Sequence, residues 1–180
     1  MRNKKILIVF IILILIVLGF LGYYFYNTYF CYTDVVAVDN SFKVTVPNRV
    51  KYKVKEVSDE NYTLDFYSVK DEMFFYSNVI DKQSEIDLNE VVSTEKNNLC
   101  SNLEDVKIVS DVTESNINNY KACKYSYTYT DSSYGNNLYA EVVWIETDSK
   151  IYILDLEVIT KNMEKYKTIF EEIENSFVEF

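Results

Sequence analysis

The chain has 180 residues, a net charge of −10 and no histidine. Acidic proteins are poor partners for nucleic acid, because phosphate binding needs a basic surface. The lack of histidine removes the commonest general base, the commonest zinc ligand and any Ser-His or Cys-His nucleophile pair, so the familiar hydrolases are excluded. No metal-binding or cofactor-binding motif is present, and we expect neither group.

The first feature in chain order is an apolar run over residues 6–22 that contains no polar or charged side chain. Extended through the aromatic residues to 26, it is long enough to cross a hydrocarbon core of roughly 30 Å as a helix. Residues 1–5 carry three basic side chains, and no charge follows until Asp34. The positive-inside rule therefore predicts a cytoplasmic terminus at 1–5, a single transmembrane helix at 6–26 and an extracellular remainder.

Two alternatives to a retained anchor fit less well. A cleaved signal peptide has an apolar region of about 7–15 residues and a small-residue cleavage site, whereas this run is longer and ends in bulky aromatics. A bacterial lipoprotein needs small residues before its lipidated cysteine, but Thr28, Tyr29 and Phe30 precede Cys31. We expect a protein of a bacterial cell membrane that keeps its anchor.

The part after the anchor is long enough for one ordinary domain. It holds all 28 acidic residues and 15 of the 18 basic ones, so it carries a charge of −13. Residues 27–40 show no clear periodicity and are expected to form a linker, and the domain is expected to span 41–180. Alternation and apolar runs predict strands at 41–47, 49–55, 62–69, 72–80, 106–112, 120–130, 138–146 and 151–160.

Two helices complete the prediction. Asp87 and Glu90 have the spacing of a capping box, and apolar residues then recur at helical spacing to about Asn102. Asn162 is expected to cap a last helix with a continuous apolar stripe. Several strands are apolar without alternation, which indicates a sheet covered on both faces.

Four basic residues alternate along one predicted strand: Arg49, Lys51, Lys53 and Lys55. They could contact an anionic partner such as lipid headgroups or a phosphate-bearing wall polymer. The interpretation that we favour is that lysines protect an edge strand against sheet-to-sheet aggregation.

The three cysteines allow two interpretations. An extracellular location permits a disulfide between Cys100 and Cys123, which leaves Cys31 unpaired beside the membrane. The alternative is three free thiols, and the sequence does not decide between them.

Two side-chain patterns suggest a site on the sheet. Tyr125, Tyr127 and Tyr129 share one strand face, which could stack on a sugar but is more typical of a core. If the last hairpin turns at residues 148–149, Trp144 lies opposite Ile153, and Asp155 and Glu157 share its face. Two carboxylates and a tryptophan there could form a glycosidase-like pair.

Four features, in their order along the chain, resemble the PsbP-like superfamily. They are Phe42-x-Val44-x-Val46-Pro47, the helix after four strands, the turn Asn118-Asn119-Tyr120-Lys121-Ala122, and the closing Phe170-x-x-Ile173-x-x-Ser176-Phe177. The chain lacks the tryptophan that is common after Pro47, and Asn118-Asn119 replaces the usual Asn-Gly. The resemblance implies an α+β fold in which an antiparallel sheet lies between helices. It also implies a role in binding or assembling other proteins, and no functional residues can be carried over.

We therefore expect a membrane-anchored, non-catalytic binding or assembly module, whose partner could be another envelope protein. The sequence predicts no oligomeric state. The second hypothesis is a carrier of a small apolar or lipid-like ligand, which needs a closed apolar pocket larger than about 300 Å³. The third is a carboxylate-based hydrolase centred on Asp155 and Glu157, which needs both carboxylates to face one cleft.

Overall fold

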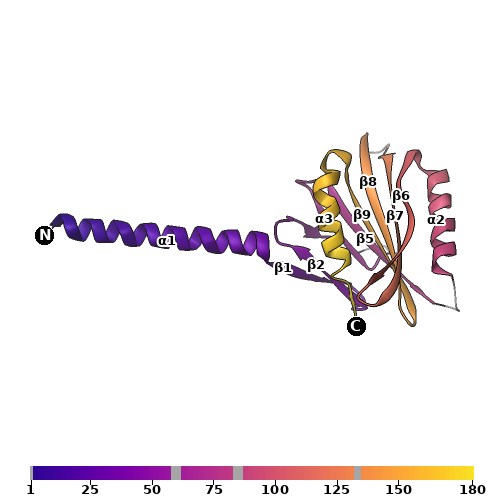
Figure 1. Cartoon of the computed structure of the whole chain (residues 1–180), viewed down its shortest axis with the longest axis horizontal. Helices are drawn as coiled ribbons and strands as arrows, with labels where there is room; N and C mark the ends of the chain where they lie inside the picture. The colour runs from indigo at the N-terminus through magenta and orange to yellow at the C-terminus, as the bar shows by residue number, and fades with distance from the viewer. Residues whose placement is uncertain (1, 58–61, 83–86, 132–134) are drawn as a thin grey trace.

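The structure is a computed structural model that describes residues 2–57, 62–82, 87–131 and 135–180. The turn predicted at 58–61 lies outside this range. A long helix and a folded domain make up the described chain (Figure 1).

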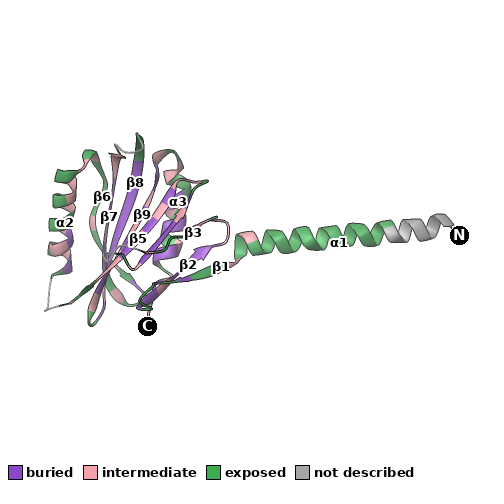
Figure 2. Ribbon diagram, turned by 180° about the vertical axis from the view of Figure 1, so that it is seen from behind, coloured by how far each residue is buried: buried purple, intermediate pink, exposed green. Residues whose placement is uncertain are grey.

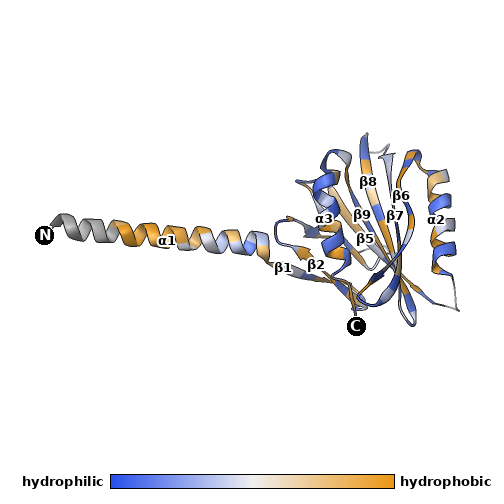
Figure 3. Cartoon of the chain, viewed as in Figure 1, coloured by the Kyte–Doolittle hydropathy of each residue, from blue (hydrophilic) through white to orange (hydrophobic). Residues whose placement is uncertain are grey.

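The long helix is α1, Arg2–Phe30. Within the described residues one helix is long and apolar enough to cross a membrane, and its candidate span is Phe10–Phe30, with a mean hydropathy of 2.1 and no burial against the domain. Figure 3 shows the middle of α1 in orange and its end near the domain in paler and blue colours. The helix continues four residues beyond the predicted end at 26, through the aromatic residues that suit a membrane interface.

A seven-stranded antiparallel sheet forms the centre of the domain, in the order β3-β4-β5-β9-β8-β7-β6. Its strands are β3 Lys53–Val54, β4 Leu64–Ser68, β5 Met73–Asp81, β6 Glu104–Ile117, β7 Tyr120–Asp131, β8 Asn136–Glu146 and β9 Lys150–Ile159. The β8–β9 hairpin pairs Trp144 with Ile153 and Val142 with Asp155, which is the predicted register. Asn118 and Asn119 both have positive φ in the β6–β7 turn, a conformation that asparagine tolerates better than most residues.

Helix α2, Leu88–Asn102, covers one face of the sheet and α3, Met163–Glu174, covers the other (Figure 1). The predicted arrangement of an antiparallel sheet between helices is confirmed. Asp87 caps α2 by accepting hydrogen bonds from the backbone N–H groups of Asn89 and Glu90, at 3.0 and 3.4 Å. Asn162 is the last residue of a 3-10 turn, Thr160–Asn162, and immediately precedes α3. Its side chain does not cap the helix and instead donates to the Asp71 carbonyl.

The expected linker at 27–40 is wrong, because it contains the end of α1 and strand β1, Tyr32–Val36. This strand pairs with β2, Phe42–Pro47, which also pairs with β10, Val178–Glu179, in a second, three-stranded sheet. Only Val35 is buried in β1, so the alternation that marks a strand is missing from its sequence.

The junction between α1 and β1 is a single residue, Cys31. Asn48, which follows the neighbouring strand β2, hydrogen-bonds to residues on both sides of this junction. Its backbone N–H donates to the Cys31 carbonyl at 3.0 Å, and its side-chain amide donates to the Asn27 carbonyl at 3.2 Å and accepts from the Thr33 hydroxyl at 2.7 Å. The end of the helix is thereby attached to the domain.

Each face of the large sheet has its own apolar core, shown by the buried strands in Figure 2. The larger core lies between the sheet, α3 and the small sheet, and is dense in aromatic rings such as the stacked pair Phe66 and Phe75, whose centroids are 4.4 Å apart. The smaller core lies under α2 and includes Leu88, Val92 and Cys123. The smaller core is the one that leaves space for a site.

Candidate functional site

A cavity of about 510 Å³ opens between the second half of α2 and the large sheet. It is lined by residues from α2, β7, β8 and β9 together with Leu103, which follows α2: Glu95, Asn98, Leu99, Asn102, Leu103, Tyr125, Tyr127, Tyr129, Val142, Trp144, Ile153, Asp155 and Glu157. Its size is typical of a small-ligand site.

The sequence of α2 explains why the helix leaves a hollow. Leu88 and Val92 in its first half are fully buried against the sheet, whereas the positions that line the cavity in its second half include Glu95, Asn98 and Asn102. Polar side chains keep their contact with water, so this half does not close onto the sheet. The first half holds the helix in place and the second half forms a rim.

The floor of the cavity carries two carboxylates on β9. Asp155 lies opposite Val142 and Glu157 lies opposite Ala140 on β8. Because successive residues on a strand point to opposite faces, Asp155 and Glu157 share the α2 face, with Trp144 on the neighbouring strand. Their expected proximity is confirmed, and both carboxylates line the same cavity.

A ladder of tyrosines on β7 forms one wall. The rings of Tyr125 and Tyr127 are 6.0 Å apart and those of Tyr127 and Tyr129 are 5.6 Å apart, measured between centroids. The Tyr129 hydroxyl donates to Glu157 Oε1 at 2.8 Å. The first two tyrosines are buried, as predicted for core residues, and they also face the cavity.

The carboxylates sit in an environment that disfavours their charge. Burial raises the pKa of Asp155 well above its ordinary value, and the neighbouring Glu157 adds to the effect. Burial also raises the pKa of Glu157, although the hydrogen bond from Tyr129 opposes this. No lysine or arginine is among the described residues that line the cavity.

Two buried polar atoms at this site have no hydrogen-bond partner among the described residues: Trp144 Nε1 and Asp155 Oδ1. Trp144 is only 6% exposed, so its donor cannot rely on bulk water. Buried polar groups in folded proteins are nearly always paired, and an unpaired donor and acceptor in one cavity are what a ligand would satisfy.

The same sheet face continues beyond β9 onto β5. Phe74 lies opposite Glu157 and Tyr76 lies opposite Asp155, and the two rings are parallel with centroids 6.4 Å apart. Next to them is a smaller hollow of about 300 Å³, whose apolar lining comes from Tyr67, Val69, Phe74, Leu138 and Ile159. An apolar surface therefore adjoins the acidic floor.

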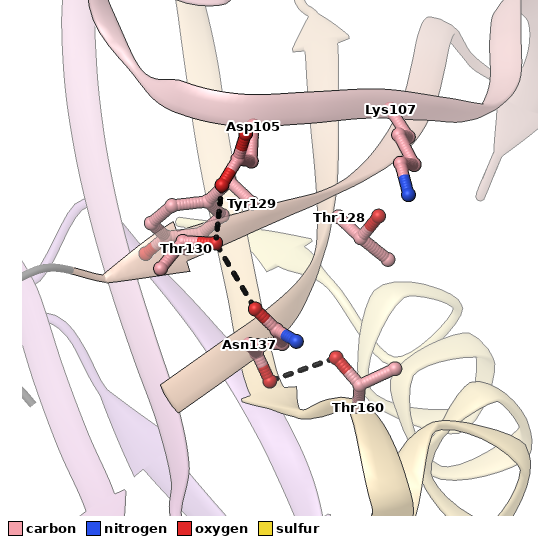
Figure 4. A pocket seen from close by; sticks show the side chains of 7 residues that line it. All are labelled: Asp105, Lys107, Thr128, Tyr129, Thr130, Asn137 and Thr160. Carbon is pink, nitrogen blue, oxygen red and sulfur yellow. Dashed lines mark hydrogen bonds between the residues drawn. The ribbon is translucent and has the colours of Figure 1, made fainter. Parts of the chain in front are cut away.

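A third hollow, of about 420 Å³, lies near the end of the β7–β8 hairpin (Figure 4). Several of its polar groups hydrogen-bond to one another. The Thr130 hydroxyl lies 3.4 Å from Asp105 Oδ2 and 3.0 Å from Asn137 Oδ1, and the Thr160 hydroxyl donates to the Asn137 carbonyl at 2.7 Å. Because these groups satisfy each other, the hollow is a weaker candidate than the α2 cavity.

Comparison with solved structures identifies the architecture. The domain is similar to cyanobacterial PsbP (CyanoP) from Synechocystis sp. PCC 6803, with a TM-score of 0.58 and 10% identity over 83% of this chain and 92% of that one. It is similar to LpqN, involved in cell envelope biogenesis of Mycobacterium tuberculosis, with a TM-score of 0.57 and 13% identity over 82% and 90% of the two chains. The fold is PsbP-like.

This likeness confirms the resemblance inferred from the sequence at the level of the fold. A protein of unknown function from Pseudomonas aeruginosa shares the PsbP-like fold too, with a TM-score of 0.53 and 13% identity over 83% of this chain and 97% of that one. No protein-family model and no curated protein sequence matches the chain.

Most of the predicted strand that carries the four basic residues is not a strand in the PsbP-like domain. Only residues 53–54 of the predicted strand 49–55 are in a strand, β3, so alternation does not align the four side chains. Arg49 forms an ion pair with Glu172 on α3 at 2.6 Å, and Lys55 pairs with Asp65 on β4 at 3.3 Å. The Lys51 ammonium donates to the Asn48 carbonyl. Strand β3, which contains Lys53, lies at the edge of the large sheet, in agreement with the favoured interpretation that lysines protect an edge strand.

All three cysteines are free thiols, which is the second of the two interpretations that the sequence left open. Cys123 packs in the core with Leu88 at the first turn of α2, while Cys100 lies twelve residues farther along the helix, about 18 Å away at 1.5 Å per residue. Burial raises the pKa of the Cys123 thiol, which keeps it protonated and unreactive.

Sequence reasoning missed the contribution of α2 to the PsbP-like domain's cavity. The polar turn at Glu95 to Asn98 interrupts the apolar stripe of the helix, and that interruption was the available signal. It also missed Tyr76, whose place beside Asp155 depends on the pairing of β5 with β9, two strands that are far apart in sequence.

Proposed function

We propose that the protein is a single-pass, membrane-anchored binding module, and that the α2 cavity is its binding site. The observation that supports this most directly is the pair of unsatisfied buried atoms, Trp144 Nε1 and Asp155 Oδ1, in a cavity of ligand size. A domain with no ligand gains nothing from leaving these groups unpaired, because each costs about 1–3 kcal/mol.

The proposed orientation places the amino terminus in the cytoplasm and the PsbP-like domain outside the cell. Three basic residues before the apolar run support this orientation. The similar protein LpqN is described as involved in cell envelope biogenesis, which favours another envelope protein as the partner.

A lipid carrier fits the cavity less well. The cavity is open to solvent and has two carboxylates on its floor, whereas a lipid-like ligand needs a closed apolar pocket. Helix α2 also lies on the side of the sheet away from α1, so the cavity beneath α2 is on the side of the sheet away from the membrane that α1 would cross (Figure 1).

A carboxylate-based hydrolase is the second candidate, and the shared cavity of Asp155 and Glu157 is the observation that favours it. Glycosidase carboxylates flank the scissile bond. Here both come from one face of one strand, about 7 Å apart along it at 3.3 Å per residue, and so stand side by side on a floor. This arrangement supports binding over catalysis.

Site-specific photocross-linking in intact cells tests the proposed site. A photoreactive residue at Asn98 on the rim of the cavity should give a discrete cross-linked partner, whereas the same residue at the exposed Glu171 on α3 should not. Equal cross-linking at both positions, or none at Asn98, contradicts a partner site in the α2 cavity. Activity on envelope polysaccharides that Glu157→Gln abolishes would support the hydrolase instead.

A further inference from the structure

The chemistry of the cavity indicates what kind of group it binds. Its lining carries three carboxylates, from Glu95 on the rim and from Asp155 and Glu157 on the floor, and no basic residue among the described residues faces them. Other acidic residues of the domain do have basic partners, as Glu172 has in Arg49 and Asp65 has in Lys55. A positive group in contact with these carboxylates would offset the cost of burying their charge.

The walls add a second requirement. Tyr125, Tyr127, Tyr129 and Trp144 surround the carboxylates, and cations are attracted to the faces of aromatic rings, most strongly to those of tryptophan. Aromatic walls with an acidic floor are suited to an organic cation, which has apolar surface next to its charge. The apolar hollow at Phe74 and Leu138 provides room for such surface.

A metal ion fits less well. The described residues contain no group of three or more His, Cys, Asp or Glu side chains placed to hold one. A hard cation such as calcium takes six to eight oxygen ligands, whereas aromatic rings occupy much of the surface around Asp155 and Glu157.

We infer that the cavity binds an alkylammonium or guanidinium group, held between Asp155 and Glu157 against Trp144 and the tyrosine ladder. This inference rests on the proposed function and specifies its ligand. A basic side chain of a protein partner and a free amine carry the same group.

The chain provides its own probe, because Trp144 is its only tryptophan and lines the cavity. Full-length protein in detergent micelles is titrated at constant ionic strength, and Trp144 fluorescence is followed. The peptide probes are Nα-acetylarginine amide and its uncharged analogue Nα-acetylcitrulline amide. The free-amine probes are phenethylammonium and the neutral phenethyl alcohol.

Each cation is expected to bind at least tenfold more tightly than its neutral analogue, and the tighter of the two cations identifies the source of the group. Asp155→Asn should weaken cation binding about tenfold, while Asp34→Asn, which removes an exposed carboxylate on β1, should leave it unchanged. A thermal unfolding curve of each variant checks that it is folded.

Equal binding of a cation and its neutral analogue, or no response to any probe, overturns the inference. That result is distinguishable from failure of the proposed function. If Asn98 still cross-links a partner, the binding module stands and its ligand is not a cation; if cross-linking fails while cations bind, the ligand class stands and the partner is not a protein.

Discussion

At the scale of single residues, the site and the fold make opposite demands on Asp155. Its carboxylate points into a cavity where one oxygen has no partner and where burial disfavours its charge. Such a residue lowers the stability of the fold, and proteins accept this cost at functional sites.

Replacing Asp155 by asparagine should therefore stabilise the protein at neutral pH. The pKa of Asp155 is raised in the folded state, so the stability it provides is complete at acidic pH and is lost as the pH rises toward that raised pKa. We expect Asp155→Asn to raise the free energy of unfolding on the order of 1–2 kcal/mol at pH 7, with a smaller gain at pH 4. Thermal unfolding followed by Trp144 fluorescence measures both values, and a loss of stability at pH 7 would contradict the assignment.

The residue scale also shows what sequence can and cannot predict. A two-residue hairpin turn determines the register of its strands, and this arithmetic correctly placed Asp155 and Glu157 on the face of Trp144. The absence of a disulfide between Cys100 and Cys123 could not be inferred from the sequence, because the distance between the two residues depends on how α2 lies on the sheet.

At the scale of elements, the two helices are attached to the sheet by different means. Helix α3 carries a buried carboxyl, Glu174, whose Oε2 accepts a hydrogen bond from Lys124 Nζ on β7 at 3.2 Å. Lys124 also approaches Glu141 on β8 at 3.5 Å, and the Tyr139 hydroxyl donates to Glu141 at 2.7 Å. Burial raises the pKa of Glu174 to about 9, and Glu141 contributes to the shift.

This cluster predicts a dependence of stability on pH. Because the folded-state pKa of Glu174 is raised, its contribution is complete below about pH 4.3, the pKa of an unperturbed glutamate, and is lost as the pH rises toward 9. Glu174→Gln removes that loss. The free energy of unfolding of the variant minus that of wild type should increase with pH between 5 and 9, by about 1 kcal/mol per unit. Unfolding curves at pH 5, 7 and 9 measure this difference. A difference that stays constant with pH would show that the pKa of Glu174 is not raised in the folded protein.

Helix α2 depends on its cap. Asp87 accepts hydrogen bonds from two backbone N–H groups, and its removal leaves the first turn without them. We expect Asp87→Ala to lower the free energy of unfolding by about 1 kcal/mol, and Asp87→Ser to restore most of it. Hydrogen exchange should become faster in the first turns of α2, while the rate in α3 stays unchanged. Faster exchange throughout the domain would mean that the cap does not act locally.

The elements also differ in how visible they are in the sequence. Central strands and α3 have continuous apolar patterns and were predicted to within a few residues. Strand β6 extends over Glu104–Ile117 but has mostly exposed side chains and several register shifts, so only residues 106–112 were predicted. Strand β1 was missed for the same reason, since most of its side chains are exposed. Such strands are held by backbone hydrogen bonds, and their side chains show no alternation from which the strand could be predicted.

At the scale of the whole molecule, α1 and α2, the helix that lines the cavity, lie on opposite sides of the large sheet (Figure 1). The proposed topology predicts which residues a reagent outside the cell can reach. In a Cys31→Ser variant, Cys100 is partly exposed on α2 and Cys123 is buried, so a membrane-impermeant maleimide should label Cys100 in intact cells. A cysteine placed at Asn3, in a variant that lacks Cys31 and Cys100, should react only after the cells are permeabilised. Labelling of the cysteine at position 3 in intact cells, and of Cys100 only after permeabilisation, would contradict the proposed topology.

The one-residue junction at Cys31 limits how the domain can meet a partner. With a flexible linker, the range of positions open to the domain would increase with the number of linker residues. Here α1 is followed by β1 after one residue, and Asn48 forms hydrogen bonds to Asn27 and Cys31 at this junction. In the proposed topology, the height of the cavity above the lipid and the direction it faces are then nearly constant. Encounters depend on sideways diffusion in the plane of the bilayer, and a partner must present its own group at that one height.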